Sequence, residues 1–269
     1  MKYFDIHCHC YPDKVAAIAV ENSQKKADVK VYSDATVKGL QKSARAANIS
    51  GCLNLPVVMN VDSTIAVNEW AAKINNDVEN FPEIYSLGSV HPNTKNIKDV
   101  LKWIRNDLGL KGIKLHPEYQ KFKFEDLNLR AIWEGCIENN LFILTHTGRD
   151  ISFPEVPNSN PRSLLQFHER YPELTLVLGH FGSWNLWDDI DLLIGQNLYL
   201  DTAFILPFLS KERIVEVIRK HGADKIIFGT DTPWGNQKKD LEEFDELPLT
   251  DAEKKLIFYE NAKKLLDLK

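Results

Sequence analysis

The stretch GIKLHPEYQKFKFEDLNLRAIWEGCIENNLFILTH, residues 112–146, contains the repeating unit of this chain. Short apolar runs at residues 112–116 and 142–146 are typical of buried strands, and residues 127–139 between them have helical spacing. A strand, a helix and a second strand in this order predict two parallel strands joined by a helical crossover.

The same alternation runs through the rest of the chain. Six further runs are predicted strands, at residues 3–7, 51–55, 84–88, 174–179, 198–201 and 225–229. Seven further runs are predicted helices, at residues 34–48, 63–78, 96–108, 161–170, 186–194, 210–221 and 251–268. Eight strand–helix units in 269 residues predict a closed (β/α)8 TIM barrel, with an open doubly wound sheet as the alternative. We expect one domain over residues 1–269, because no linker interrupts the pattern.

Two further features concern the boundaries of these elements. Asp34, Ser63 and Asp251 are predicted N-terminal caps, because their side-chain oxygens can accept hydrogen bonds from first-turn amides. Residues 11–33 are longer than an ordinary strand–helix connection. We predict that they form a lid or rim element over the first strand.

The composition is that of a globular protein with mixed charges. Lys and Arg total 33 and Asp and Glu total 38, a net charge of −5, which gives no footprint for nucleic acid or an anionic membrane. The first residues lack the apolar core of a signal peptide, and no apolar run reaches the roughly 18 residues of a membrane helix. Four cysteines are too few for a disulfide scaffold. We therefore expect a cytoplasmic protein with reduced thiols and a small-molecule substrate, and leave a homo-oligomeric state open.

Polar side chains follow several predicted strands, at the end where a barrel carries its functional groups. His7 and His9 share one face of the first strand, because side chains alternate along a strand. His146, His180 and Asp231 end later strands. A single histidine at a strand end is more often a hydrogen-bonded structural residue. Several such groups at one end of a barrel instead predict a shared divalent metal site.

Five pieces of the sequence resemble the amidohydrolase superfamily, and within it the amidohydrolase-related branch of metal-dependent TIM-barrel hydrolases. The pieces are FDIHCH (4–9), GIKLHP (112–117), LTHTG (144–148), LGHFG (178–182) and IFGTDTPW (227–234). Each piece alone is a weak signal. Together they occur in the family's order over nearly the whole chain.

The resemblance implies a role for each residue at a matching position. His7, His9 and His146 match metal ligands, and Asp231 matches a carboxylate that binds the metal and shuttles a proton. His180 matches a histidine that ligates a second metal in some members and orients water or substrate in others. Asp231 and His180 are accordingly the expected catalytic residues. The expected metal is Zn²⁺, with one ion per chain or two.

The remaining candidates surround this site. Lys114 matches a lysine that is carboxylated and bridges two metals in binuclear members, and it otherwise steadies an anionic substrate. His116, Tyr119, Arg149 and Trp234 follow the ligand-bearing strands and are predicted to contact substrate, Arg149 through a substrate carboxylate. The alternatives are a surface salt bridge for Arg149 and packing within the loops for Tyr119 and Trp234.

These residues predict a metal-dependent hydrolase of an amide, lactone or ester in a small polar molecule. The metal would lower the pKa of a bound water from about 16 toward about 7. The alternative function is a metal-dependent, non-oxidative decarboxylase, a lyase, acting on a small unsaturated or aromatic carboxylate. A third possibility is a barrel with a structural metal, which a closed shell of protein ligands would indicate.

Overall fold

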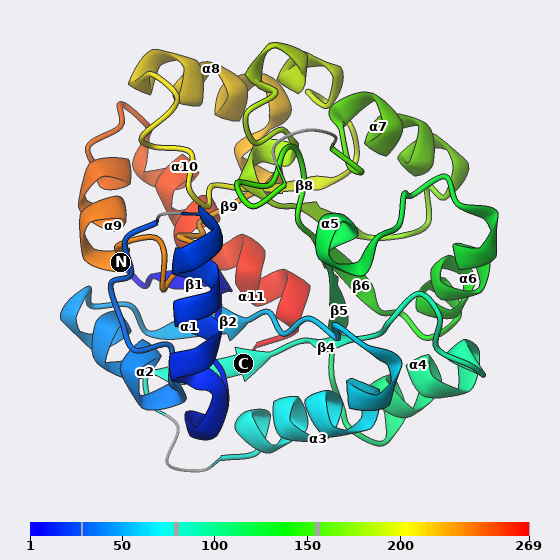
Figure 1. Cartoon of the computed structure of the whole chain (residues 1–269). Helices are drawn as coiled ribbons and strands as arrows, with labels where there is room; N and C mark the ends of the chain where they lie inside the picture. The colour runs from blue at the N-terminus through cyan, green and yellow to red at the C-terminus, as the bar shows by residue number, and fades with distance from the viewer. Residues whose placement is uncertain (28, 78–80, 154–156, 269) are drawn as a thin grey trace.

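In the computed structural model the strands pair in parallel and in chain order, within one sheet of three strands and one of six (Figure 1). The structure describes residues 1–27, 29–77, 81–153 and 157–268. Their strands are β1 (Phe4–Cys8), β2 (Gly51–Asn54), β3 (Glu83–Ser86), β4 (Gly88–Ser89), β5 (Gly112–Leu115), β6 (Phe142–Thr145), β7 (Leu176–Leu178), β8 (Tyr199–Asp201) and β9 (Ile226–Ile227).

Backbone hydrogen bonds close these strands into a ring. Only Leu87 separates β3 from β4, and its amide donates to the carbonyl of Asn54 at 3.1 Å, so the two strands form one position of the barrel. On the other side, the amide of Ile6 in β1 donates to the carbonyl of Phe228 at 2.9 Å, and the amide of Asp231 donates to the carbonyl of His7 at 2.8 Å. The predicted (β/α)8 barrel is therefore confirmed, because the first strand pairs with the last, whereas an open doubly wound sheet keeps two unpaired edge strands.

The helices surround the ring of strands, except α1 and α11, which overlap the strands in this view (Figure 1). They are α1 (Asp13–Ala27), α2 (Val37–Ala46), α3 (Thr64–Asn75), α4 (Ile97–Asn106), α5 (Pro117–Gln120), α6 (Arg130–Glu138), α7 (Pro161–Arg170), α8 (Lys211–His221), α9 (Gln237–Asp245), α10 (Asp251–Lys255) and α11 (Asn261–Leu266). A π-helical turn, Leu256–Glu260, joins α10 to α11.

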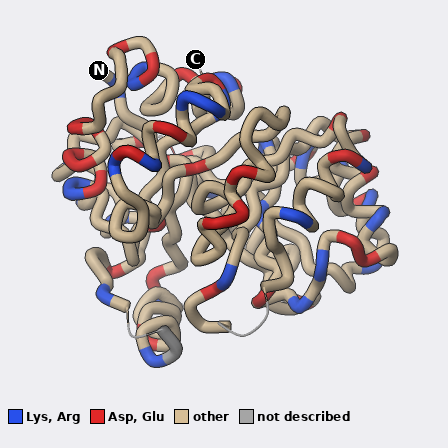
Figure 2. Tube along the Cα trace, turned by 90° about the horizontal axis from the view of Figure 1, so that it is seen from above, with Lys and Arg blue, Asp and Glu red and all other residues tan. Residues whose placement is uncertain are grey.

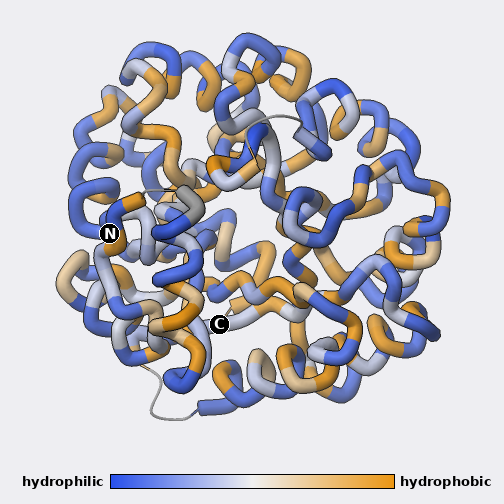
Figure 3. Tube along the Cα trace, in the orientation of Figure 1, coloured by the Kyte–Doolittle hydropathy of each residue, from blue (hydrophilic) through white to orange (hydrophobic). Residues whose placement is uncertain are grey.

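The apolar side chains form two cores. One lies inside the barrel and includes Phe4, Ile6 and Leu144, together with Ala262 and Leu266 of α11. The other fills the layer between the strands and the surrounding helices. Figure 3 shows the corresponding pattern, with hydrophobic residues along the strands and hydrophilic residues on the outer turns of the helices. Because α11 and the inner core fill one end of the barrel, the space for a cavity lies at the opposite end, where the strands terminate.

Several predicted elements differ from the structure. The helix predicted at residues 186–194 is a 3₁₀-helix at Trp187–Leu192. The helix predicted at 63–78 ends at Asn75, and residue 78 lies outside the described residues. The sequence analysis did not predict α9, which follows Asp231 after a short turn. The predicted lid or rim segment at 11–33 contains α1.

Two of the three predicted caps are displaced by one or two residues, and the third lies at the N-cap position without capping the helix. Thr36, and not Asp34, caps α2, while the Asp34 carboxylate accepts from the amide of Thr36 at 2.9 Å. Thr250, and not Asp251, caps α10 in a capping box. Ser63 precedes α3, but its side chain makes no capping hydrogen bond.

The surface carries mixed charge, with acidic and basic residues interspersed around the molecule (Figure 2). Within the described residues, no helix has the length and apolar character that crossing a membrane requires. All four cysteines are buried and free.

Candidate metal centre

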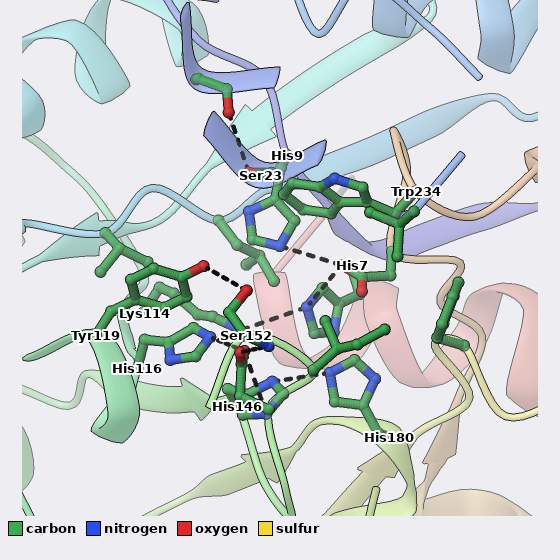
Figure 4. A pocket seen from close by; sticks show the side chains of 18 of the residues that line it. His7, His9, Ser23, Lys114, His116, Tyr119, His146, Ser152, His180 and Trp234 are labelled. Atoms are coloured by element: carbon green, nitrogen blue, oxygen red, sulfur yellow. Dashed lines mark hydrogen bonds and ion pairs between the residues drawn. The ribbon is translucent and has the colours of Figure 1, made fainter. Parts of the chain in front are cut away.

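A cavity of about 350 Å³ opens at the end of the barrel where the strands terminate. Ala19, Asn22 and Ser23 line it from one face of α1, so the segment predicted as a lid does cover the site. The predicted site residues that line it are His7, His9, Lys114, His116, Tyr119, His146, His180, Asp231 and Trp234. Figure 4 shows the labelled histidine rings gathered around this cavity.

An irregularity in β1 aims two histidines into the cavity. Phe4 and Ile6 belong to the inner core, whereas Cys8 belongs to the outer core. Strict alternation would put Ile6 and Cys8 on the same face, but the pairing of β1 with β2 shifts register between Asp5 and Cys8. An extra residue of this kind reverses the direction of the side chains that follow it. His7 and His9 consequently both line the cavity.

His7, His9 and Asp231 form a compact group of donor atoms. The Oδ1 atom of Asp231 lies 3.3 Å from Nε2 of His9 and 3.6 Å from Nε2 of His7. For metal–ligand bonds of about 2.1 Å, tetrahedral donor atoms lie about 3.4 Å apart. The three side chains therefore fit a divalent cation, and they leave coordination positions for water or substrate.

The second ring nitrogen of His7 is also held in place. Its Nδ1 atom lies 2.7 Å from Oδ2 of Asp201, at the end of β8. The other carboxylate oxygen of Asp201 accepts from the amides of His180 and Ala203 at 2.8 and 3.1 Å. A carboxylate in this position fixes the tautomer of a metal-binding histidine and directs its Nε2 lone pair toward the cation.

Burial sets the charge of these groups. It lowers the pKa of His7 well below the ordinary value, and the charge of Lys114 lowers it further. Burial also lowers the pKa of His9, although Asp231 opposes it. Burial raises the pKa of Asp231, but the hydrogen bond with His9 and the charges of His7 and His180 outweigh it and bring the pKa to about 2. At neutral pH the site thus presents neutral imidazoles and a charged carboxylate, as metal binding requires.

The backbone around His7 is shaped to admit its ring. A Cβ atom added at Gly229 would lie 2.9 Å from Cβ of His7, and one added at Gly179 would lie 3.2 Å from its Cε1. Asp231 and His180 adopt left-handed φ values of 65° and 56°. Non-glycine residues in this region cluster at functional sites, where the surrounding structure holds them.

His180 and His146 lie beside this group. The His180 ring centroid is 5.0 Å from that of His7, and its Nδ1 lies 2.8 Å from the carbonyl of Ala203. Its Nε2 lies 3.1 Å from Nδ1 of His146. The donor atoms of His146 group instead with those of His116 and Asp150. The expected role of His146 as a ligand beside His7 and His9 therefore stays a prediction.

Lys114 is fully buried at the floor of the cavity. Its Nζ lies 3.3 Å from Nε2 of His7. Burial lowers its pKa to about 8, against the opposing charges of Asp201 and Asp231. Among the described residues that line the cavity, Lys114 is the only Lys or Arg. It is therefore the available positive charge for an anionic substrate.

The predicted rim residues have different positions. Tyr119 and Trp234 line the cavity, and the Trp234 ring packs 5.1 Å from that of His9. Arg149 is not among the described residues that line it, and its amide donates to the carbonyl of Trp184 at 2.8 Å. The predicted contact of Arg149 with a substrate carboxylate has no support in this geometry.

Two buried carboxylates of the site, Asp201 and Asp150, were not predicted from the sequence. Asp201 ends a correctly predicted strand, so the rule that identified the histidines also applies to it. Asp150 follows His146 by four residues in a loop, and no periodic signal marks it.

Replacing Asp201 by asparagine is expected to weaken metal binding by about 10–100-fold, the usual loss when the carboxylate behind a histidine ligand is removed. Asparagine has one oxygen, so it cannot serve His7 and the amides of His180 and Ala203 together. Competition with a chromophoric chelator measures the change. Asp99→Asn, a substitution at an exposed position of α4 outside the cavity lining, is the control and should bind metal as the wild type does. Equal affinity of Asp201→Asn and wild type would contradict this role.

Comparison with known proteins identifies the family of this chain and shows which solved structures share its fold. A family model described as Amidohydrolase matches residues 65–268. A gamma-resorcylate decarboxylase from Polaromonas sp. is 26% identical over 121 residues, which are 37% of this chain and 36% of that protein. An uncharacterized TIM-barrel protein from Bordetella bronchiseptica has a TM-score of 0.82 at 19% identity, covering 99% of both chains.

A further similar structure contains a metal. It is a 5-carboxyvanillate decarboxylase from Novosphingobium aromaticivorans, solved with manganese and 4-hydroxy-3-methoxy-5-nitrobenzoic acid. Its TM-score is 0.74 at 12% identity, covering 99% of this chain and 96% of that one. At this identity the two proteins share the fold, and the likeness extends no further.

Proposed function

The chain belongs to the amidohydrolase family, and we propose that it is a metal-dependent, non-oxidative decarboxylase of a small aromatic or unsaturated carboxylate. One observation carries the proposal: the cavity places a buried ammonium beside a metal-binding donor group and surrounds both with aromatic rings. The partial similarity to gamma-resorcylate decarboxylase supports the same reaction class. The function expected first from the sequence, hydrolysis, becomes the second candidate.

The walls of the cavity suit a flat, unsaturated molecule. The aromatic residues among its lining are Tyr11, Tyr119, Trp184, Phe204 and Trp234. Aromatic side chains bury planar rings well, because offset and edge-to-face contacts add to the area that they cover. The volume of about 350 Å³ lies at the lower end of the range for small-molecule sites, about 300–1,000 Å³.

The floor of the cavity suits a carboxylate. With a pKa of about 8, the Lys114 amine is mostly protonated at neutral pH. Its position 3.3 Å from Nε2 of His7 lets it pair with a carboxylate placed at the donor group. A cation bound by His7, His9 and Asp231 would supply Lewis-acid polarisation of that carboxylate. Two imidazoles and a carboxylate suit both Zn²⁺ and Mn²⁺.

Decarboxylation breaks the bond between the ring carbon and the carboxylate, releases CO₂ and leaves an electron pair on the carbon that a proton must quench. We assign this proton transfer to Asp231. With its pKa at about 2 the carboxylate is charged, so it first takes a proton from a substrate hydroxyl or from solvent. It then donates that proton to the vacated carbon, which is general acid catalysis.

Hydrolysis remains the second candidate because of His180. The carbonyl of Ala203 lies 2.8 Å from its Nδ1, and Nε2 lies 3.1 Å from Nδ1 of His146, so the two rings are held together in the cavity lining, where they can orient a water molecule. A cation held by the same donor group would then supply activation of a water molecule in place of polarisation of a carboxylate.

An activity screen separates the two functions. Protein loaded with Mn²⁺ or Zn²⁺ is given hydroxybenzoates and unsaturated carboxylates, and CO₂ is followed in a coupled assay. We expect CO₂ release equal to substrate loss, and in D₂O one deuterium at the carbon that carried the carboxylate. Matched analogues without the carboxylate are the control. Cleavage of amides, esters or lactones by the same preparation, without CO₂ from any carboxylate, would overturn the proposal in favour of hydrolysis.

A further inference from the structure

One wall of the cavity holds a histidine between two buried carboxyl groups. Nε2 of His116 lies 3.4 Å from Oδ2 of Asp150, and Nδ1 of the same ring lies 3.6 Å from Oε2 of Glu118. His116 and Asp150 line the cavity, whereas Glu118 is 3% exposed and is not one of its described lining residues. None of the three takes part in the proton transfer assigned to Asp231.

The ring of His116 is held firmly in this orientation. It stacks on the ring of His146, with centroids 4.4 Å apart and planes at 6°, and it meets the Tyr119 ring edge to face at 4.6 Å. The amide of His116 donates to Oε1 of Gln120 at 2.9 Å, and Nε2 of Gln120 donates to two backbone carbonyls at 2.9 and 2.8 Å. Backbone and ring are therefore both fixed, and the two ring nitrogens stay directed at the two carboxyl groups.

Two buried atoms without partners face each other at the Nδ1 side of this ring. Among the described residues, neither Nδ1 of His116 nor Oε2 of Glu118 has a hydrogen-bond partner. The two atoms lie 3.6 Å apart, just beyond hydrogen-bond distance. Buried polar atoms without partners are rare in folded proteins. A small movement of either side chain would satisfy both atoms at once, provided that one of them carries a proton.

Asp150 determines which nitrogen of His116 carries the ring proton. Burial raises the pKa of Asp150, but its interactions with His116 and with the amide of Ser152 outweigh burial and hold the pKa below the usual range. The charged Oδ2 faces Nε2 of His116 and so stabilises a proton on that nitrogen. Burial lowers the pKa of His116, against the effect of Asp150, so the ring is neutral at neutral pH and has one N–H. Nδ1 therefore has a lone pair and needs a donor.

Glu118 can supply that donor. Burial raises its pKa to about 7, although a hydrogen bond from the amide of Asn158 opposes this. The lone pair on Nδ1 of His116 stabilises the protonated form further. No Lys or Arg forms an ion pair with Glu118 in the described part of the chain. Asn158 donates to Oε1 at 2.9 Å, which leaves Oε2 to carry the proton toward the ring.

We propose that Glu118 is a positioning residue, whose protonated carboxyl group donates to Nδ1 of His116 and thereby presents the Nε2–H group of that ring to the substrate. With Asp150 beside it, the cavity wall then offers a donor and an acceptor 3.4 Å apart. A hydroxyl group satisfies both, because it accepts one hydrogen bond and donates another. The inference rests on the proposed function and deepens it: the substrate is a carboxylate with a hydroxyl group that lies against His116 and Asp150.

Sulfonates test the hydroxyl preference without turnover, because a sulfonate has the negative charge of a carboxylate but cannot release CO₂. Calorimetric titration of the Zn²⁺-loaded protein compares benzenesulfonate with its three hydroxy derivatives. We expect the best of these to bind at least about 10-fold more tightly than benzenesulfonate, because one of its hydrogen bonds goes to a charged group.

Substitutions of Glu118 separate its role as a donor from a merely structural one. Glu118→Gln should keep the hydroxyl preference, because its amide also donates to Nδ1 of His116. Glu118→Met is similar in shape but has no donor, so it should lower the preference about 3–10-fold and leave the affinity for benzenesulfonate unchanged. The matched control Glu125→Met, at an exposed position outside the cavity lining, should keep the wild-type preference.

The tautomer of His116 provides an independent readout. Long-range ¹H–¹⁵N spectra of the histidine-labelled, Zn²⁺-loaded protein show which ring nitrogen carries the proton, and His116→Gln identifies the signals. We expect a neutral ring with its proton on Nε2 in the wild type and in Glu118→Gln.

Three results would each overturn the role of Glu118. They are a His116 ring that carries a proton on Nδ1 in the wild type, a hydroxyl preference lost in Glu118→Gln as in Glu118→Met, and no gain in affinity from a hydroxyl group in the wild type. The first and third are measured on the wild type, so they decide the question even if Glu118→Met does not fold. None depends on CO₂ release, so a negative CO₂ screen would reject the decarboxylase and leave this test intact.

Discussion

Replacing His7 by alanine is expected to abolish stable metal binding and to lower turnover by more than about 100-fold, the upper end of the loss when only a partner behind a ligand is removed. The reason is that both nitrogens of the His7 ring are used by the site. Its Nε2 is one of three atoms in the donor group, and its Nδ1 is the atom that Asp201 holds at 2.7 Å. Alanine leaves His9 and Asp231, which is too few protein ligands for a catalytic site of this kind.

Elemental analysis after dialysis measures the metal, and circular dichroism shows whether the barrel survives. His91→Ala is the matched control, because His91 also follows a strand of the barrel but does not line the cavity of the donor group. The control should keep its metal. Full metal occupancy in His7→Ala would mean that the cation lies elsewhere, and the proposed function would lose its basis.

The barrel could be predicted from the sequence because its signal is local and repeated. Each strand is a short buried run, and each following helix has its own periodicity, so errors of a residue at either end leave the count of units unchanged. The helix at Pro161–Arg170 was predicted with its observed bounds, since Asn160 and Pro161 mark its start. By contrast, α9 was missed because polar residues dominate Gln237–Asp245 and only Leu241 and Phe244 are buried apolar positions.

The candidate site was less predictable, because which of its side chains lie together depends on distances between atoms on different strands. Sequence position placed the histidines and Asp231 at one end of the barrel. It could not show that His146 Nδ1 faces His180 while Nε2 faces Asp150. Nor could it show which cation faces the cavity: Arg149 lies close to His146 in sequence, but the structure gives that position to Lys114.

Replacing Asp231 by asparagine is expected to lower kcat by about 10²–10⁴-fold, the usual contribution of a positioned proton-transfer group. The amide can still offer an oxygen near Nε2 of His9, now 3.3 Å from the carboxylate, so metal binds more weakly but can be saturated. It cannot carry a proton to the vacated carbon. KM should change little, because the aromatic walls and Lys114 that hold the substrate are untouched.

The measurement is therefore kcat at saturating metal, with occupancy confirmed by elemental analysis of the same sample. Asp99→Asn, which makes the same chemical change at an exposed position of α4 outside the cavity lining, controls for the loss of a carboxylate and should retain wild-type kcat. His180→Gln tests the other candidate for proton transfer, because the His180 ring also lines the cavity beside the donor group. If fully metallated Asp231→Asn turned over at the wild-type rate while His180→Gln did not, the proton would come from His180. The assignment of proton transfer to Asp231 would then be wrong, although the donor group itself would stand.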